Sequence, residues 1–178
     1  MNNWLPFPFT EEQWNIPGIK LHLGCGNIYL NDFVNIDLDN PVADENYNVF
    51  KLPYKNNSVS LILASHIIEH FKWQDHIPLL TEWNRVLISN SWLIIEAPNL
   101  EESCKNFLEE KDNYKRVTEV FPQLFGRADF SAGNIHLSGV WHTYLYDILK
   151  KTNFIQAVQR SPIKNNIQSR CLRVDCRK

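Results

Sequence analysis

Two glycines that flank a cysteine, Gly24-Cys25-Gly26, come directly after a short apolar segment at residues 19–23. The segment predicts a buried strand, and glycines at its end let the backbone turn sharply and let a ligand approach without meeting a Cβ atom. In open α/β sheets, ligands bind at the carboxyl ends of the strands, where this loop would lie. Because a plain strand-to-helix turn also uses glycine, the loop indicates a nucleotide-like ligand only together with other residues.

Apolar segments and helical periodicities alternate along the rest of the chain. Further strands are expected at residues 33–38, 47–50, 59–64, 92–97, 154–158 and 171–176, and helices at 78–87, in pieces over 100–125, and at 140–151. The segment at 59–64 is nearly all apolar, which is typical of a central parallel strand. This order predicts an α/β fold, a Rossmann-like and mostly parallel seven-stranded sheet with helices on both faces.

The first crossover of this sheet is expected to be unusually short. Only about nine residues join the first strand to the second. A crossover between parallel strands normally takes about a dozen residues or more. A first crossover helix would therefore have one or two turns at most.

The length of 178 residues suits a single domain. Residues 1–18 contain Pro6, Pro8 and Pro17, which oppose regular helix, and Trp4 and Trp14, which suggest packing onto the domain. We therefore expect an irregular N-terminal segment at residues 1–18, packed on a domain that spans residues 19–178.

Composition narrows the class of partner and the compartment. The net charge is −2 and no run of basic residues stands out, so that nucleic acid is an unlikely partner. No signal peptide and no apolar run of membrane-spanning length are seen. The spacing of the cysteines fits neither a zinc site nor a disulfide framework, and we expect reduced thiols in a cytoplasmic protein. The cysteines are Cys25, Cys104, Cys171 and Cys176.

A carboxylate at the end of the second predicted strand narrows the choice of ligand. Asp37 stands where a carboxylate can accept hydrogen bonds from both ribose hydroxyls, with Asp39 as the nearby competitor. A dinucleotide fingerprint would need a third glycine where Tyr29 stands and an acid about twenty residues on. S-adenosylmethionine has no phosphate and tolerates a looser loop, so that we favour it over a dinucleotide.

Four runs in a fixed order resemble one known family. The chain is similar to the class I S-adenosylmethionine-dependent methyltransferases, most of all to the small bacterial branch called methyltransferase type 11, over roughly residues 19–160. The runs are Leu21-His-Leu-Gly-Cys-Gly-Asn27, Val34-Asn-Ile-Asp37, Asn48-Val-Phe-Lys-Leu-Pro-Tyr54 and Val59-Ser-Leu-Ile-Leu-Ala-Ser-His-Ile-Ile-Glu-His70. The resemblance implies S-adenosylmethionine as the cofactor, methyl transfer as the activity, and an antiparallel last strand.

The resemblance also implies roles for matching positions. The glycine loop would line the methionine portion, Asp37 would hold the ribose, and Ser65 and His66 would face the methyl group and the acceptor. The residues expected at the adenine are Leu38, Asn48 and Val49.

Several positions depart from the family pattern. His22 stands where many relatives have an acid, and Asn48 and Ser60 replace common aspartates. These changes leave room for weaker cofactor binding. One alternative is therefore a methyltransferase-fold module that binds the cofactor without turnover.

The run His66-Ile-Ile-Glu69-His70 has a rival interpretation. H-x-x-E-H is also a zinc-protease motif, in which two histidines one helical turn apart bind the metal and the glutamate acts as base. Here the motif follows a central apolar strand directly and little helix continues after it. We therefore expect no metal site, and a zinc hydrolase remains the less favoured alternative.

The expected reaction is O- or N-methylation of a small molecule, with a sugar or a surface-polysaccharide precursor as one candidate acceptor. A base that titrates near neutrality helps if the acceptor is a hydroxyl, and histidine meets that need. The expected catalytic residues are His66 and, second, His136, which lies in a polar loop after the fifth strand. His142 is expected on a helix surface. The oligomeric state is left open.

Overall fold

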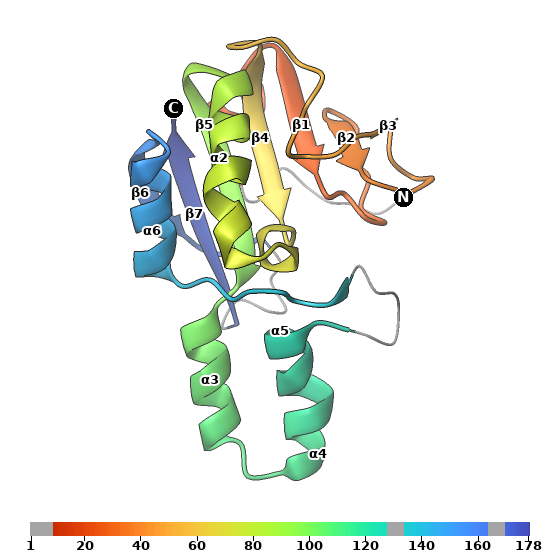
Figure 1. Ribbon diagram of the computed structural model, residues 1–178, viewed down its shortest axis with the longest axis vertical. Helices are drawn as coiled ribbons and strands as arrows, with labels where there is room; N and C mark the ends of the chain where they lie inside the picture. The colour runs from red at the N-terminus through yellow and green to blue at the C-terminus, as the bar shows by residue number, and fades with distance from the viewer. Residues whose placement is uncertain (1–8, 128–133, 164–169) are drawn as a thin grey trace.

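The computed structural model of the protein describes residues 9–127, 134–163 and 170–178 (Figure 1). Its centre is a seven-stranded sheet with the strand order β3-β2-β1-β4-β5-β7-β6. The strands are β1 (Ile19–Leu23), β2 (Val34–Asp37), β3 (Glu45–Asn46), β4 (Val59–Ser65), β5 (Leu87–Pro98), β6 (Ile155–Arg160) and β7 (Cys171–Arg177).

One strand of the seven runs against the others. The pairs formed among β1 to β5 are parallel, whereas β7 pairs antiparallel with both β5 and β6. Leu23 lies opposite both Ile36 and Ala64, which aligns the carboxyl ends of β1, β2 and β4 along one edge of the sheet. The predicted fold class, with its antiparallel last strand, is confirmed.

Two local features differ from the expectation. The third strand is Glu45–Asn46, so that the expected strand at 47–50 is wrong, and residues 24–33 connect β1 to β2 through turns without any helix. Buried Asn35 supplies part of the hydrogen bonding that a helix would have provided. Its Oδ1 accepts from the backbone of Leu30, and its Nδ2 donates to the carbonyl groups of Leu30 and Phe33. One side chain thereby satisfies backbone groups that the short connection leaves without regular partners.

Two helices cover one face of the sheet, α2 (His76–Val86) and α6 (His142–Lys151), and both lie in front of it in Figure 1. The apolar period of α2 places Trp83 and Leu80 fully inside the main core, against strand residues such as Leu21 and Ile62. The indole of Trp83 also donates to the carbonyl of Val49 at 3.2 Å, which ties the segment after β3 to the helix.

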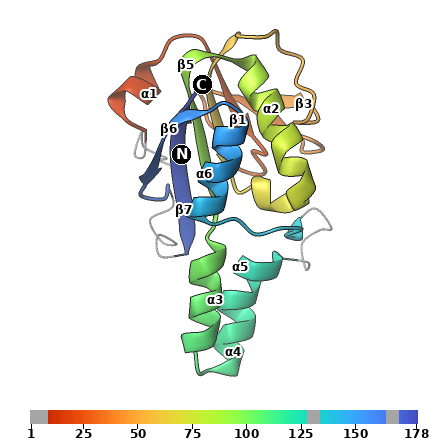
Figure 2. The ribbon, with the colours of Figure 1, turned by 60° about the vertical axis from the view of Figure 1, so that its left-hand side comes forward.

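The opposite face carries the short helix α1 (Glu11–Asn15), which Figure 2 shows on the side away from α2. A capping box between Thr10 and Gln13 starts this helix. Phe9 and Trp14 pack against a second core cluster that contains Leu61, Leu63, Phe33, Trp92 and Ile94. Residues 9–16 therefore take the place of a crossover helix on this face.

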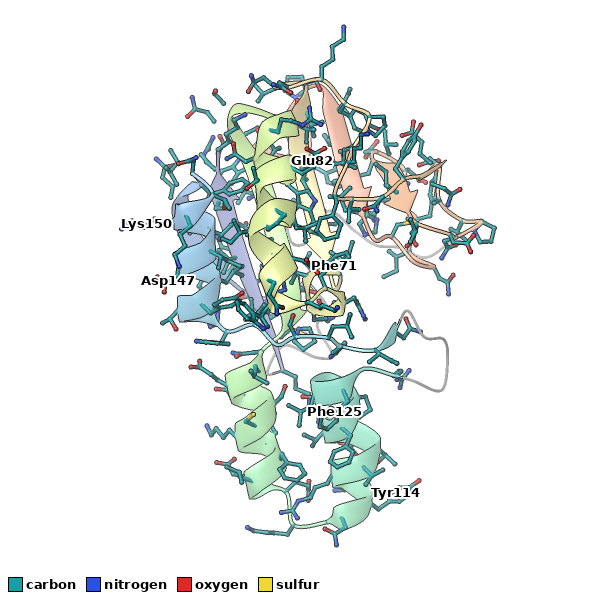
Figure 3. All side chains as sticks on the ribbon, in the orientation of Figure 1. Phe71, Glu82, Tyr114, Phe125, Asp147 and Lys150 are labelled. Carbon is teal, nitrogen blue, oxygen red and sulfur yellow. The ribbon has the colours of Figure 1, made fainter. Side chains whose placement is uncertain are left out.

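A helical arm extends beyond the carboxyl ends of the parallel strands (Figures 1 and 2). It runs from α3 (Leu100–Glu109) through α4 (Asn113–Lys115) and a π-helical turn, η3 (Arg116–Val120), to α5 (Phe121–Phe125). Phe107 packs against Phe121 with ring centroids 5.8 Å apart. Tyr114 and Phe125, labelled in Figure 3, are largely exposed on the arm. Within the described ranges, no helix is long and apolar enough to cross a membrane.

Candidate functional site

The glycine loop follows β1 in a conformation that glycine alone adopts easily. Gly24 and Gly26 have φ angles of 64° and 51°, in the left-handed region. A Cβ atom on Gly24 would lie 2.6 Å from the side chain of Ile67, whereas one on Gly26 would meet no atom within 4 Å. The first glycine is therefore needed for packing, and the second presents bare backbone to open space.

The loop and the carboxylate of β2 are joined directly. The backbone N–H of Gly26 donates to Oδ2 of Asp37 at 2.9 Å, and the N–H of Leu38 donates to Oδ1 at 2.8 Å. Each carboxylate oxygen keeps lone pairs for further donors. The competitor Asp39 is exposed in the turn beyond. Asp37 is therefore the carboxylate that the fold brings to the loop.

Cys25 lies between the two glycines with its thiol buried. Burial, together with the nearby carboxylates of Asp37 and Asp44, raises the pKa of Cys25 to about 11. The thiol is therefore protonated at neutral pH and is no nucleophile.

The three residues expected at the adenine lie in different environments. Leu38 is 69% exposed at the end of β2, which is unusual for a large apolar side chain. Asn48 is exposed and its Oδ1 accepts from the backbone of Phe50 at 2.9 Å. Val49 is buried in the main core. Of the three, Leu38 and Asn48 have side chains open to a ligand.

The residue after β4 has a strained backbone. His66 has a φ angle of 55°, in the left-handed region, which costs about 1–2 kcal/mol for a residue other than glycine. Its N–H donates to the carbonyl of Glu96 at 2.8 Å, and Oγ of Ser65 lies 3.5 Å from Oε1 of the same glutamate. Strain of this kind gathers at functional sites.

Two buried carboxylates flank the imidazole of His66. Its Nδ1 lies 3.3 Å from Oε1 of Glu69, and its Nε2 lies 3.5 Å from Oε1 of Glu96 and 3.7 Å from Sγ of Cys171. Burial opposes a charged ring, but the contacts with Cys171 and the two carboxylates outweigh it and raise the pKa of His66 well above 6.5. These neighbours therefore favour the protonated ring.

His136 is placed differently. Its Nδ1 donates to the carbonyl of Gln123 at 3.1 Å, so that Nε2 carries the lone pair. Burial lowers the pKa of His136 below its usual value, which keeps the ring neutral at pH 7. Its ring centroid lies 5.1 Å from that of His70. The fold thus gathers His136 with Glu69 and His70, although about 65 residues separate them in sequence.

The helix that the zinc-protease interpretation requires does not form. Ile68–His70 is a single 3-10 turn, and His66 precedes it in the left-handed conformation. His66 and His70 therefore do not share a helix face.

Sequence reasoning missed Glu96 and Cys171 as neighbours of His66. Glu96 is fully buried at the carboxyl end of β5, and Cys171 begins β7. A charged residue inside the apolar run of β5 was a signal that could have identified Glu96, because buried charges are rarely left unpaired.

The chain has the fold of the class I S-adenosylmethionine-dependent methyltransferases. The family described as "Methyltransferase domain" matches residues 21–95 of this chain. This match and the structural neighbours below confirm the resemblance inferred from the sequence and support S-adenosylmethionine as the cofactor. No curated protein matches the chain by sequence.

Three solved structures illustrate the likeness. An S-adenosylmethionine-dependent methyltransferase from Archaeoglobus fulgidus has 14% identity and a TM-score of 0.62, covering 90% of this chain and 86% of its own. A possible histamine N-methyltransferase from Thermotoga maritima has 16% identity and a TM-score of 0.61, covering 93% and 84%. The 1,6-didemethyltoxoflavin-N1-methyltransferase of Burkholderia thailandensis, solved with S-adenosylhomocysteine, has 13% identity and a TM-score of 0.58, covering 91% and 71%. At these identities the likeness concerns the fold.

Proposed function

We propose that this protein is an S-adenosylmethionine-dependent methyltransferase that acts on oxygen or nitrogen of a small molecule. The observation that carries the proposal is the hydrogen bond from the Gly26 backbone to Asp37, which joins the ends of β1 and β2 into one ligand-binding edge. In open α/β sheets this edge is where nucleoside-like ligands bind.

The residues at this edge fit the cofactor. Gly26 faces open space, as close approach of a ligand to the backbone requires. Asp37 is fixed by two backbone N–H groups and keeps lone pairs for the two ribose hydroxyls. The exposed side chain of Leu38 offers an apolar surface to the adenine. Asn48 keeps its side-chain NH₂ group and a lone pair for the adenine edge, and buried Val49 would act only by holding this segment in place.

In methyl transfer, the main task of the enzyme is to align the acceptor atom with the methyl group. S-adenosylmethionine supplies a methyl group on a sulfonium, and its leaving group is a neutral thioether. The protein must hold the acceptor atom in line with the methyl carbon, and such positioning can supply much of the rate enhancement. Ser65 and His66, at the end of the central strand β4, are the residues proposed to face this point.

The two proposed catalytic histidines would have different roles. The neighbours of His66 favour its protonated form and both ring nitrogens already contact side chains, so that it suits positioning of the site better than removal of a proton. His136 is neutral and its Nε2 lone pair is available, which suits a base for a hydroxyl acceptor. We therefore reverse the order expected from the sequence and propose His136 as the proton acceptor.

Two observations support a small-molecule acceptor. The names of two structural neighbours contain small nitrogen compounds, and the chain has no basic run for nucleic acid. The four cysteines carry free thiols, which supports a reducing compartment such as the cytoplasm. Nothing observed favours the zinc hydrolase or the module without turnover.

Calorimetric titration with S-adenosylhomocysteine, followed by transfer of a labelled methyl group to a panel of small alcohols, phenols, sugars and amines, tests the proposal. We expect binding at one site per chain and transfer to at least one acceptor class. Absence of S-adenosylhomocysteine binding would refute the proposal, and binding without transfer would leave the binding module as the function.

A further inference from the structure

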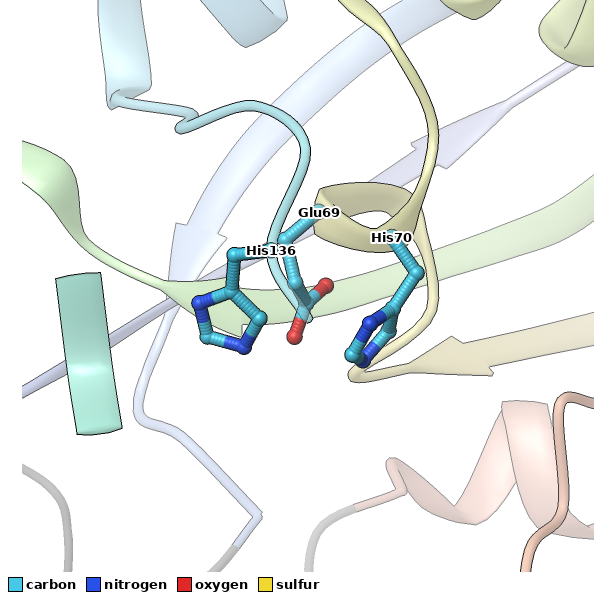
Figure 4. Close-up of side chains that lie close together, drawn as sticks. All are labelled: Glu69, His70 and His136. Atoms are coloured by element: carbon cyan, nitrogen blue, oxygen red, sulfur yellow. The ribbon is translucent and has the colours of Figure 1, made fainter. Parts of the chain in front are cut away.

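We propose that Glu69, His70 and His136 form a binding site for one divalent transition-metal ion (Figure 4). One ligand atom from each side chain lies within 4.8 Å of the other two. Figure 4 shows the two imidazoles on either side of the carboxylate. The three residues come from the turn after β4 and from the segment that precedes α6, so that tertiary structure alone brings them together.

Both imidazoles are oriented for metal binding. Nδ1 of His70 donates to the carbonyl of Ile135 at 3.0 Å, and Nδ1 of His136 donates to the carbonyl of Gln123 at 3.1 Å. A neutral ring that donates through one nitrogen carries its lone pair on the other. Metal-binding histidines usually have this second hydrogen bond, which sets the tautomer and the ring orientation.

The carboxylate of Glu69 has fewer partners than its burial demands. The residue is 2% exposed, and neither carboxylate oxygen accepts a hydrogen bond of ordinary geometry from the residues that the structure describes; Nδ1 of His66 lies 3.3 Å from Oε1. A buried carboxylate is costly unless charges and hydrogen bonds compensate it. A cation between Glu69 and the two imidazoles would supply that compensation, while His66 continues to contact Oε1 from its own side.

The backbone holds the two halves of the site together. The carbonyl of Glu69 accepts from the N–H groups of Leu137 and Ser138 at 2.9 and 3.2 Å, and the N–H of His136 donates to Phe125 at 3.1 Å. Gly126 allows this approach, since it has a φ angle of 77° and a Cβ atom there would overlap the carbonyl oxygen of Asn134. Backbone hydrogen bonds to the helical arm and to the turn at the sheet edge therefore fix the position of the site.

The donor set selects the class of ion. Two imidazole nitrogens and one carboxylate suit zinc, iron or manganese, whereas calcium prefers oxygen ligands alone. Neighbouring ligands of a zinc ion with bonds of about 2.0–2.2 Å lie roughly 3.4 Å apart, so that small side-chain rotations would close the set. Three protein ligands leave a position open, as in catalytic zinc sites.

The site has one consequence that rests on the proposed function. A bound metal would take the Nε2 lone pair of His136, and this residue would then be a ligand and no longer a base. A metal ion lowers the pKa of a coordinated hydroxyl. The acceptor would then be a hydroxyl compound that binds the metal through the oxygen to be methylated.

The test titrates the full chain, freed of metal with a chelator, with zinc chloride in a calorimeter. We expect one ion per chain and at least a tenfold loss of affinity in each of His70→Ala, His136→Ala and Glu69→Gln. His142→Ala is the matched control and should bind zinc like the wild type, because His142 begins α6 outside the cluster. Unchanged affinity in the three site variants would overturn the proposal.

A measurement on the wild type tests the metal site even if the variants fail to fold. Cobalt substituted for zinc should give visible absorption bands without the intense ultraviolet band of a cobalt–thiolate bond. A thiolate band that disappears in Cys171→Ser would place the metal elsewhere and overturn the proposal. S-adenosylhomocysteine binding is measured on the same samples. If the wild type does not bind S-adenosylhomocysteine, the proposed function is refuted. If it binds S-adenosylhomocysteine but not zinc, the metal site alone is refuted.

Discussion

Nε2 of His66 lies 3.5 Å from Oε1 of Glu96, a carboxylate that is fully buried at the carboxyl end of β5. The same ring contacts the buried Glu69 through Nδ1 at 3.3 Å. A protonated imidazole between two buried carboxylates compensates part of their charge. The relationship favours a positive charge on His66 at the predicted methyl-transfer point.

This charge should make stability depend on alkaline pH. The folded-state pKa of His66 lies well above 6.5, so that its contribution is fully present below about 6.5 and is lost as the pH rises towards the folded pKa. We expect the free energy of unfolding in urea to fall as the pH rises above about 6.5, and the fall to shrink in His66→Gln.

His142→Gln is the control for that experiment. Burial lowers the pKa of His142, so that this residue titrates below 6.5 and should leave the alkaline slope unchanged. At the acid end, Glu69 acts in the opposite sense. Burial opposes the ionisation of Glu69, but the contact with His66 lowers the pKa of Glu69 below 4.5. The contribution of Glu69 to stability is therefore present above about pH 4.5 and is lost as the pH falls through the lowered pKa. An alkaline slope that His66→Gln leaves intact would contradict the assignment.

Asp37 should control cofactor affinity. A hydrogen bond to a charged group contributes about 1.5–3 kcal/mol, so that Asp37→Asn is expected to weaken S-adenosylhomocysteine binding by roughly 10- to 150-fold in calorimetry. Asp39→Asn is the matched control two residues away and should bind like the wild type. Equal losses in the two variants would show that net charge, and not the position of Asp37, determines affinity.

The two loop glycines should respond differently to alanine. In Gly26→Ala the methyl group meets no atom of the protein, so that stability should fall by only about 1–2 kcal/mol from the left-handed backbone, while S-adenosylhomocysteine binding weakens strongly. In Gly24→Ala the methyl group also overlaps Ile67, and stability should fall further. Thermal unfolding and calorimetry measure both effects. Wild-type affinity in Gly26→Ala would argue against a ligand beside this loop.

Gln13 should stabilise the face that α1 covers. Its Nε2 donates to Oδ2 of Asp175 at 2.8 Å, and both side chains are fully buried. Because Gln13→Ala leaves a buried acceptor short of a donor, the free energy of unfolding should fall by about 1–3 kcal/mol. Glu12→Ala removes an exposed ion pair with Arg177 and should cost no more than about 1 kcal/mol. Equal effects in urea unfolding would mean that α1 does not depend on Gln13.

The sequence alone determined the sheet and the edge that is proposed to bind the cofactor. Short apolar segments that alternate with helical segments predict parallel strands, and parallel strands align their carboxyl ends. For this reason the sequence predicted that the glycine loop and Asp37 lie at the ends of their strands, and the structure adds the hydrogen bond between them. Strand boundaries next to polar turns were less accurate, as the two-residue strand Glu45–Asn46 shows. There, hydrogen-bond register outweighs the local preference of the apolar residues that follow.

Only the tertiary structure decided the chemistry beyond that edge. His66 looked like a base in the sequence, but its partners Glu96 and Cys171 come from other strands, and their proximity favours its protonated form. His136 joins Glu69 and His70 because backbone hydrogen bonds across the molecule bring residues 135–138 onto the turn after β4. The pKa of a side chain and the closure of a ligand set depend on neighbours in space. Periodicity along the chain carries no information about those neighbours.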